Sequence, residues 1–260
     1  MMKRIALALS SGLATFVLIG SAYGQQDEAP NIVIIEIYGC TYNANNDMSD
    51  FVAVTDRWND WADERGVTDY TANILTPYLY SDAFPYDLVW LGVYPSGEAM
   101  GAGQAQWLSE GGELNAEFGE VVDCSIHAQF AATAMHVPAT PPEPSDDDVG
   151  LISFQDCTLQ NERGAQEALA AHGRWGDYLA ANGSDLFMGA LFPIAGEDPE
   201  ADYNYKAVTG FSSANTYGQF IDTVVPGGLQ TAGNIFGGIT VCDTSRVYVT
   251  TSVRETAGDD

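Results

Sequence analysis

The sequence Arg57-Trp58-Asn59-Asp60-Trp61 returns, 117 residues later, as Arg174-Trp175-Gly176-Asp177-Tyr178. Cys40 in Tyr-Gly-Cys-Thr and Cys157 in Gln-Asp-Cys-Thr are also 117 residues apart, and Cys124 and Cys242 are 118 apart, as a one-residue insertion would require. A fixed period of this kind is typical of a duplicated structural unit. The repeated tryptophan lies on the apolar face of an expected helix, so we interpret the motif as scaffold that both copies need.

A proline-rich, acidic stretch at residues 138–148 separates the two copies. Proline stiffens such a connection and removes backbone donors, as expected of a linker between folded units. The sequence therefore predicts one repeat at residues 25–137, a second at 149–255 and a short acidic tail at 256–260.

The chain begins with Met1-Met2-Lys3-Arg4, continues through an apolar run and reaches Ala22-Tyr23-Gly24. A basic start, an apolar middle and small residues before the cleavage point are typical of a secretory signal peptide, here residues 1–24. The run is interrupted by serines and glycines and is short for a bilayer span. We therefore expect a periplasmic or extracellular protein with no membrane segment after cleavage.

The composition is strongly acidic, with 36 acidic residues, nine basic ones and a formal net charge of −27. Such a surface repels nucleic acid and anionic lipid. An apolar content of 46% with thirteen tyrosines, eleven phenylalanines and five tryptophans is enough for a packed core. The acidity therefore predicts solubility rather than disorder.

The order of secondary structure is predicted to be the same in both copies. The β-branched run 32–38 favours a strand, and apolar positions from Phe51 to Ala62 recur at helical spacing, with Ser49 or Asp50 as the cap and Gly66 as the stop. Further strands are expected at 70–80 and 87–94 in copy one, then a glycine-weakened helical region from 97 and a strand at 124–135. In copy two the corresponding elements are expected at 150–157, around 169–179, at 186–194 and 203–211, from 216, and at 245–253. Each copy thus has the order β-α-β-β-α-β, the ferredoxin-like unit of an α+β fold.

The ferredoxin-like unit decides how the four cysteines pair. Cys40 and Cys157 end the first strand of their copies, whereas Cys124 and Cys242 open the last strand. In this unit the first and last strands are antiparallel neighbours, so we predict disulfides Cys40–Cys124 and Cys157–Cys242. Export makes such bridges permissible. A metal or redox role is disfavoured, since no Cys-x-x-Cys occurs and the cysteines are not grouped with histidines.

Two such units placed sheet against sheet resemble the dimeric α+β barrel superfamily, with the usual homodimer fused into one chain. The resemblance covers nearly all of the mature sequence and rests on element order and duplication. It implies a monomer with internal pseudo-twofold symmetry. Members include monooxygenases that act on aromatic compounds, haem-degrading enzymes, isomerases and proteins with no known catalysis. No histidine repeats in both copies, so we predict neither haem nor any other cofactor.

Candidate ligand-binding residues come from the strand faces. If Cys40 opposes Cys124, alternation places Glu36 and Tyr38 on one face with Ile126 and Ala128. The same reasoning in copy two places Arg246 on a face with Ser153 and Gln155. Charged side chains on a face inside the barrel need partners there. The candidate set is Glu36, Tyr38, Trp90, His127 and Arg246, and the alternative is that this face is solvated or carries a structural ion pair.

Other candidate groups carry less information. The histidines His127, His136 and His172 are scattered, and none has a visible partner in the sequence. Two acidic loops, 43–50 and 197–202, invite a calcium hypothesis, but neither has the spaced ligands and central glycine of an EF-hand. We predict no metal site.

Three functions remain open at this stage. The first is a secreted protein that binds a small apolar or aromatic ligand, in a pocket between helices and sheet or within the barrel. The second is an enzyme of the monooxygenase or isomerase kind. The third is a non-catalytic structural or interaction protein of the envelope. No catalytic residue is assigned, because fold alone fixes no chemistry.

Overall fold

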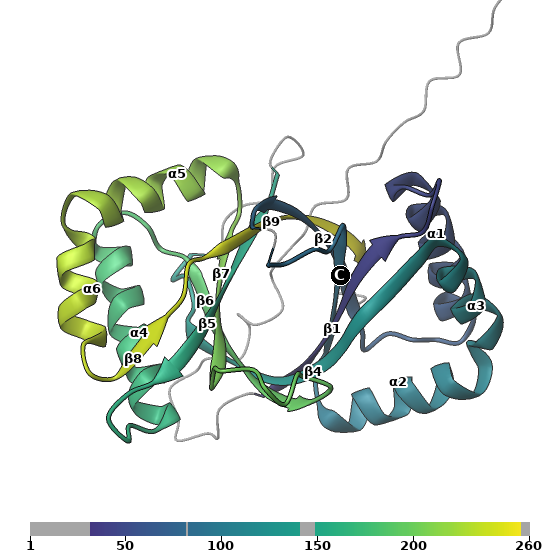
Figure 1. Ribbon diagram of the computed structural model, residues 1–260, viewed down its shortest axis with the longest axis horizontal. Coiled ribbons are helices and arrows are strands. Elements are labelled where there is room, and N and C mark those ends of the chain that lie inside the picture. The colour runs from purple at the N-terminus through teal and green to yellow at the C-terminus, as the bar shows by residue number, and fades with distance from the viewer. Residues whose placement is uncertain (1–31, 82, 141–148, 256–260) are drawn as a thin grey trace, which may run out of the picture.

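The computed structural model describes residues 32–81, 83–140 and 149–255 (Figure 1). The predicted signal peptide, the predicted acidic tail and most of the predicted linker lie outside the described residues. A curved sheet occupies the centre, with one group of helices on each side (Figure 1). None of the described helices is long and apolar enough to span a membrane.

Both halves of the chain begin with a long strand and then alternate helices with strands. The elements of the first half are β1 (Val33–Tyr42), α1 (Met48–Glu64), β2 (Thr71–Leu79), β3 (Leu88–Tyr94), α2 (Gly97–Glu110), α3 (Gly112–Val121) and β4 (Val122–His136). The elements of the second half are β5 (Leu151–Leu159), α4 (Ala165–Ala181), β6 (Phe187–Ala195), β7 (Tyr205–Phe211), α5 (Ala214–Thr223), the π-helical turn η2 (Val224–Gly228), α6 (Leu229–Phe236), β8 (Thr240–Cys242) and β9 (Arg246–Arg254).

The strands form one antiparallel sheet in the order β7-β6-β4-β1-β3-β2-β9-β5-β8. A further pairing between β5 and β7 closes all of these strands except β8 into a barrel. The first-half strands are adjacent in the order β4-β1-β3-β2, and the second-half strands in the order β9-β5-β7-β6. The two sets join through β2–β9 and β4–β6. Closure leaves few free strand edges, which protects the sheet from pairing with other chains.

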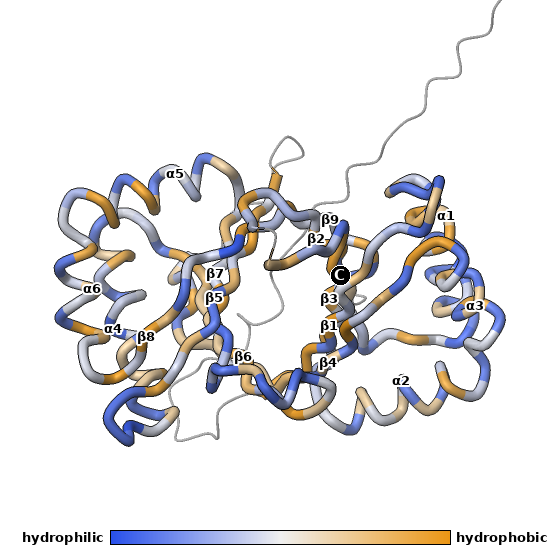
Figure 2. Tube along the Cα trace, in the orientation of Figure 1, coloured by the Kyte–Doolittle hydropathy of each residue, from blue (hydrophilic) through white to orange (hydrophobic). Residues whose placement is uncertain are grey.

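Alternation along the strands sends one set of side chains into the barrel and the other set under the helices. Hydrophobic positions mark the central strands (Figure 2). The barrel interior is a single apolar cluster built by both halves, which includes Val33, Ile35, Leu75, Leu91, Phe130, Ile152, Phe154, Val208 and Tyr248. The outer face of the first-half strands packs against α1, α2 and α3 in a separate, aromatic-rich cluster that includes Phe51, Trp58, Tyr70, Trp90 and Tyr94.

Helix α1 shows how the local sequence sets an element's limits. Its cap is Asp47, two or three residues before the predicted cap, and the Asp47 carboxylate accepts a hydrogen bond from the Ser49 backbone at 2.8 Å. The Asp50 carboxylate in turn accepts a hydrogen bond from the Asp47 backbone N–H, which completes a capping box. The predicted stop is confirmed, because Gly66 follows the last residues with a φ of 66°.

The predicted second helical regions are each divided. In the first half, Gly111 ends α2 and also caps α3, so two helices replace the single weakened one. In the second half, Pro226 lies in the π-helical turn between α5 and α6. Proline and paired glycines interrupt the helical hydrogen-bond ladder, which accounts for both breaks.

Both predicted disulfides are present, Cys40–Cys124 and Cys157–Cys242, with sequence separations of 84 and 85. Each one joins the first strand of a half to the strand that follows its last helix. One detail differs from the prediction: Cys242 does not open the last strand, because it lies in the separate three-residue strand β8. The described residues contain no free cysteine.

Candidate functional site

A cavity of about 500 Å³ lies between the outer face of the first-half strands and helices α1, α2 and α3. Its walls are rich in aromatic side chains, which include Phe51, Trp58, Trp61, Trp107 and Phe118. Trp58 and Trp90 meet edge to face with ring centroids 5.2 Å apart, and Trp61 and Trp107 do so at 5.4 Å. Such arrangements hold large rings in fixed orientations. We call this cavity the first-half pocket.

A buried carboxylate lies at the base of the first-half pocket. Glu36, on β1, is 6% exposed, and its Oε1 accepts a hydrogen bond from the Tyr70 hydroxyl at 2.6 Å. The same hydroxyl accepts a hydrogen bond from Trp90 Nε1 at 2.8 Å. The indole therefore fixes the position of the phenol, and the phenol fixes one carboxylate oxygen.

The second carboxylate oxygen faces the pocket rim. Glu36 Oε2 lies 3.7 Å from Nε2 of His127, which is on β4 with its side chain 48% exposed. Tyr38 stacks on the His127 ring with centroids 3.9 Å apart. The imidazole thus connects a buried carboxylate with solvent, and the stacked phenol restrains its orientation.

Three tyrosines near Glu36 stay protonated. Burial, and then the negative charge of Glu36, raise the pKa of Tyr38, Tyr70 and Tyr94 well above their ordinary value. Their hydroxyl groups are consequently hydrogen-bond donors at any ordinary pH. The pocket combines one buried carboxylate with several neutral phenol donors.

A glycine makes the contact between Tyr70 and Glu36 feasible. Gly92 of β3 is the cross-strand partner of Glu36. A Cβ atom at Gly92 would come 2.0 Å from the Tyr70 hydroxyl oxygen. Glycine in a strand interior often marks such a close approach. The Tyr70 hydroxyl therefore occupies the space beside Gly92 that a side chain would otherwise fill.

Replacing Gly92 by alanine is expected to displace Tyr70 from Glu36. We expect a loss of about 1–3 kcal/mol in the free energy of unfolding, which is typical of overpacking a closed core. Urea unfolding measures it, with Gly210→Ala as the matched control, because a Cβ atom there would meet nothing closer than 3.7 Å. Equal stability of the two variants would contradict this role of Gly92.

Four of the predicted site residues, Glu36, Tyr38, Trp90 and His127, line the first-half pocket together. The predicted neighbours of Glu36 were wrong, however. A β-bulge between Gly39 and Cys40 shifts the register of β1 and β4 by one residue, so His127 faces Tyr38 and Gln129 faces Glu36. Because the side-chain period is two, this shift sends Ile126 and Ala128 to the barrel interior.

Arg246, the fifth predicted residue, does not join the other four. It lies opposite Phe154 on the barrel side of β9, and not on a face with Ser153 and Gln155 as predicted. A one-residue offset between the Phe154 and Cys157 pairings again changes the register.

The Arg246 side chain is held by groups of its own neighbourhood. It is 5% exposed, forms ion pairs with Asp243 at 2.7 Å and Asp156 at 3.2 Å, and covers the Phe84 ring at 4.2 Å. Lys206 shares Asp156 at 2.9 Å. The arrangement is a neutralised ion cluster that satisfies a buried charge.

The corresponding surface of the second half lacks this chemistry. The Ser153–Thr209 cross-strand pair matches the Glu36–Gly92 pair at the 117-residue offset. Ala207 stands where Trp90 does. The buried carboxylate and the glycine space therefore belong to the first half.

Sequence reasoning missed Tyr70, Gly92 and most of the aromatic wall. The available signal was Gly92 itself, a lone glycine in the otherwise apolar strand Leu88–Tyr94.

No protein-family model matches the chain, and no curated protein matches it. Solved structures do match. An anthrone oxidase-like protein aligns with a TM-score of 0.54 at 13% identity, over 90% of this chain and 98% of its own. A candidate monooxygenase from Fusobacterium nucleatum gives 0.54 at 9% identity, over 87% and 95%. A mutant chlorite dismutase from Candidatus Nitrospira defluvii gives 0.52 at 7% identity, over 87% and 94%.

The fold is that of the dimeric α+β barrels. These alignments span both halves, since neither half alone could supply such coverage. At these identities the likeness establishes the fold and leaves the chemistry to be argued from the pocket.

Proposed function

We propose that the protein is an oxygen-using enzyme of the monooxygenase kind that oxidises a flat, fused-ring aromatic ketone or phenol in the first-half pocket. The single observation that carries the proposal is one buried carboxylate, Glu36, in the lining of a cavity rich in aromatic side chains. The aromatic walls suit a planar ring system, and a cavity of about 500 Å³ is in the size range of small-molecule sites.

The pocket fits a reaction that begins with proton removal. Glu36 acts as the general base on an acidic C–H or O–H bond of the substrate, and a neutral phenol of Tyr38 or Tyr94 stabilises the oxyanion that forms. For an anthrone-type substrate, the resulting carbanion reacts with dioxygen to give a peroxide. Loss of water then yields the quinone, so one anthrone and one dioxygen become one anthraquinone and one water.

His127 gives the proton a route out of the pocket. It lies 3.7 Å from Glu36 Oε2 and has an exposed side chain, so it can exchange the proton on the carboxylate with solvent, from which the peroxide regains one proton before water is lost. The solved structure of an anthrone oxidase-like protein with the same fold supports the choice of substrate class.

We further propose that the two halves are ferredoxin-like units that arose by duplication, and that one exported chain acts as a monomer with internal pseudo-twofold symmetry. The matching strand orders and the 117-residue offset support duplication. The two disulfides support an oxidising compartment. On this view only the first half kept, or gained, the acidic pocket.

The test uses the protein with both disulfides intact, mixed with anthrone under air. Quenching of tryptophan fluorescence reports binding beside Trp58 and Trp90, an oxygen electrode reports dioxygen uptake, and absorbance reports anthraquinone. We expect saturable quenching and one dioxygen consumed per quinone formed, at a rate above that in buffer. Binding without turnover would favour a carrier of aromatic ligands, and the absence of both would reject the pocket as the functional site.

A further inference from the structure

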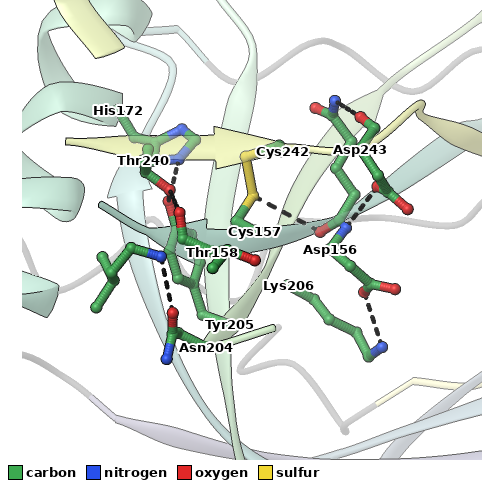
Figure 3. Close-up of a disulfide and its surroundings, with 12 residues drawn as sticks. Asp156, Cys157, Thr158, His172, Asn204, Tyr205, Lys206, Thr240, Cys242 and Asp243 are labelled. Atoms are coloured by element: carbon green, nitrogen blue, oxygen red, sulfur yellow. Dashed lines mark hydrogen bonds and ion pairs between the residues drawn. A yellow bond between two sulfur atoms is a disulfide. The ribbon is translucent and has the colours of Figure 1, made fainter. Parts of the chain in front are cut away.

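A cluster of polar side chains, His172, Tyr205 and Thr240, lies beside the second disulfide on the helix-facing side of the sheet (Figure 3). The Cys157–Cys242 bridge joins β5 to β8, and His172 reaches it from α4 (Figure 3). One ring nitrogen of His172 and the two sulfur atoms all lie within 4.8 Å of one another. His172 is 4% exposed and Cys157 is fully buried, whereas Cys242 is partly exposed.

The hydrogen bonds around His172 decide which nitrogen carries its proton. The Thr240 hydroxyl donates to the Thr158 carbonyl at 3.2 Å, so it accepts from the Tyr205 hydroxyl at 3.0 Å. The Tyr205 oxygen, 2.9 Å from His172 Nε2, is then left to accept, which places the proton on Nε2. Burial also lowers the pKa of His172 to about 4, so the ring is neutral near pH 7.

Nδ1 of His172 consequently holds a bare lone pair. Among the described residues it has no hydrogen-bond partner, although it is buried. Leaving a buried acceptor unsatisfied costs free energy, and each such group in a folded protein calls for an explanation. A neutral imidazole whose other N–H is held by a hydrogen bond is the usual state of a metal-ligating histidine.

The first disulfide provides an internal comparison. Thr55 occupies the position of His172 at the 117-residue offset, and its hydroxyl donates to the Phe51 carbonyl at 2.9 Å. Leu88 stands where Tyr205 does. A disulfide at this place in the fold therefore needs neither the histidine nor its phenol partner.

We propose that reduction of Cys157–Cys242 converts this corner into a site for a thiolate-preferring metal ion, with Cys157, Cys242 and His172 as ligands. Zn²⁺ fits this donor set, with water in the fourth position. Tetrahedral zinc with bonds of about 2.0–2.3 Å keeps its donor atoms about 3.5–4 Å apart. The separations already present are within reach of that geometry once the sulfur–sulfur bond opens.

The redox step requires a two-electron reductant, and in a biological setting a dithiol supplies it. The dithiol loses two electrons and two protons to become a disulfide, while the Cys157–Cys242 bond breaks to give two thiols. Zn²⁺ then displaces both thiol protons into solvent as it binds. Strand β8 contributes Cys242 from a segment of three residues at the end of the strand order, so a small shift of this strand can open the site. Reoxidation reverses the sequence and releases the metal.

The experiment is a titration of the anaerobically reduced protein with Co²⁺ and then Zn²⁺. A phosphine serves as the reductant because it does not bind the metal through thiolate. We expect one Co²⁺ per chain, with sulfur-to-cobalt charge-transfer bands and tetrahedral d–d bands that Zn²⁺ removes. The oxidised protein is expected to show neither set of bands.

Three variants locate the site. Cys157→Ser/Cys242→Ser is expected to abolish the bands. His172→Thr, which copies Thr55 of the first half, is expected to weaken Zn²⁺ binding at least about tenfold. His136→Gln, which changes a histidine that pairs with Asp185 and is not part of the group of proposed ligands, is the control and should leave the Zn²⁺ affinity unchanged. The proposal is overturned if wild type and His172→Thr bind Zn²⁺ with equal affinity, whether the reduced chain is folded or unfolded. It is also overturned if the Co²⁺ bands survive the loss of Cys157 and Cys242.

Discussion

Glu36→Gln is expected to lower kcat for anthrone oxidation by about 10²–10⁴-fold, which is the usual contribution of a positioned general base. The amide keeps the shape of the carboxylate and still accepts the hydrogen bond from Tyr70, so the pocket should persist. Anthrone affinity, measured by tryptophan quenching, should change little. The loss should therefore fall on kcat rather than on binding.

The matched control is Glu167→Gln on α4, which removes a carboxylate from an exposed ion pair with Arg163 in the other half. It should turn over anthrone as the wild type does. If Glu36→Gln retains wild-type kcat, Glu36 is not the base. If the variant loses affinity and rate together, the carboxylate acts in binding instead.

The periodicity of the sequence was sufficient to predict the disulfides, because cysteine pairing depends on which strands are neighbours and not on side-chain detail. Element order predicts that the strand carrying Cys40 lies beside the strand carrying Cys124, and the structure confirms the pair. The same argument holds for Cys157 and Cys242. Neighbouring strands follow from topology, which a repeat reports directly.

Strand faces could not be predicted in the same way. A single extra residue in β4 near Cys124 exchanges the two faces of everything beyond it. His127 was included among the candidates, but the residues placed beside Glu36 were Ile126 and Ala128. Bulges depend on local backbone geometry and leave little mark in the composition. Strand faces assigned by alternation from the Cys40–Cys124 pair are therefore correct only as far as the first bulge.

Contacts between elements distant in sequence were also beyond prediction. His172 lies 15 residues after Cys157 and 70 before Cys242, on an expected helix whose orientation against the sheet periodicity does not specify, so it could not be grouped with the cysteines. Tyr70 and Glu36 meet only because Gly92 leaves space on the strand between their elements. Both groupings depend on the packing of helices onto the sheet, which periodicity does not specify.

Cys40→Ser/Cys124→Ser is expected to lower the free energy of unfolding by about 4–5 kcal/mol, since the chain-entropy relation assigns this amount to a closed loop of 84 residues. The Cys157→Ser/Cys242→Ser variant removes a bridge whose loop is one residue longer, and it serves as the matched comparison. Urea unfolding of both variants and of the oxidised wild type, followed by tryptophan fluorescence, measures the two losses.

Two losses of the same size would mean that the bridges act mainly by restricting the unfolded chain, because the loops are nearly equal while the native surroundings differ. The first bridge borders an open pocket, whereas the second lies against buried His172 and Tyr205. A clearly smaller loss for the second pair would show that the native bridge is disfavoured by its unsatisfied histidine, and would identify it as the more easily reduced of the two. Losses below about 1 kcal/mol for both would contradict the entropic account, because releasing a crosslink across a loop of this length should free enough chain entropy in the unfolded state to cost several times more.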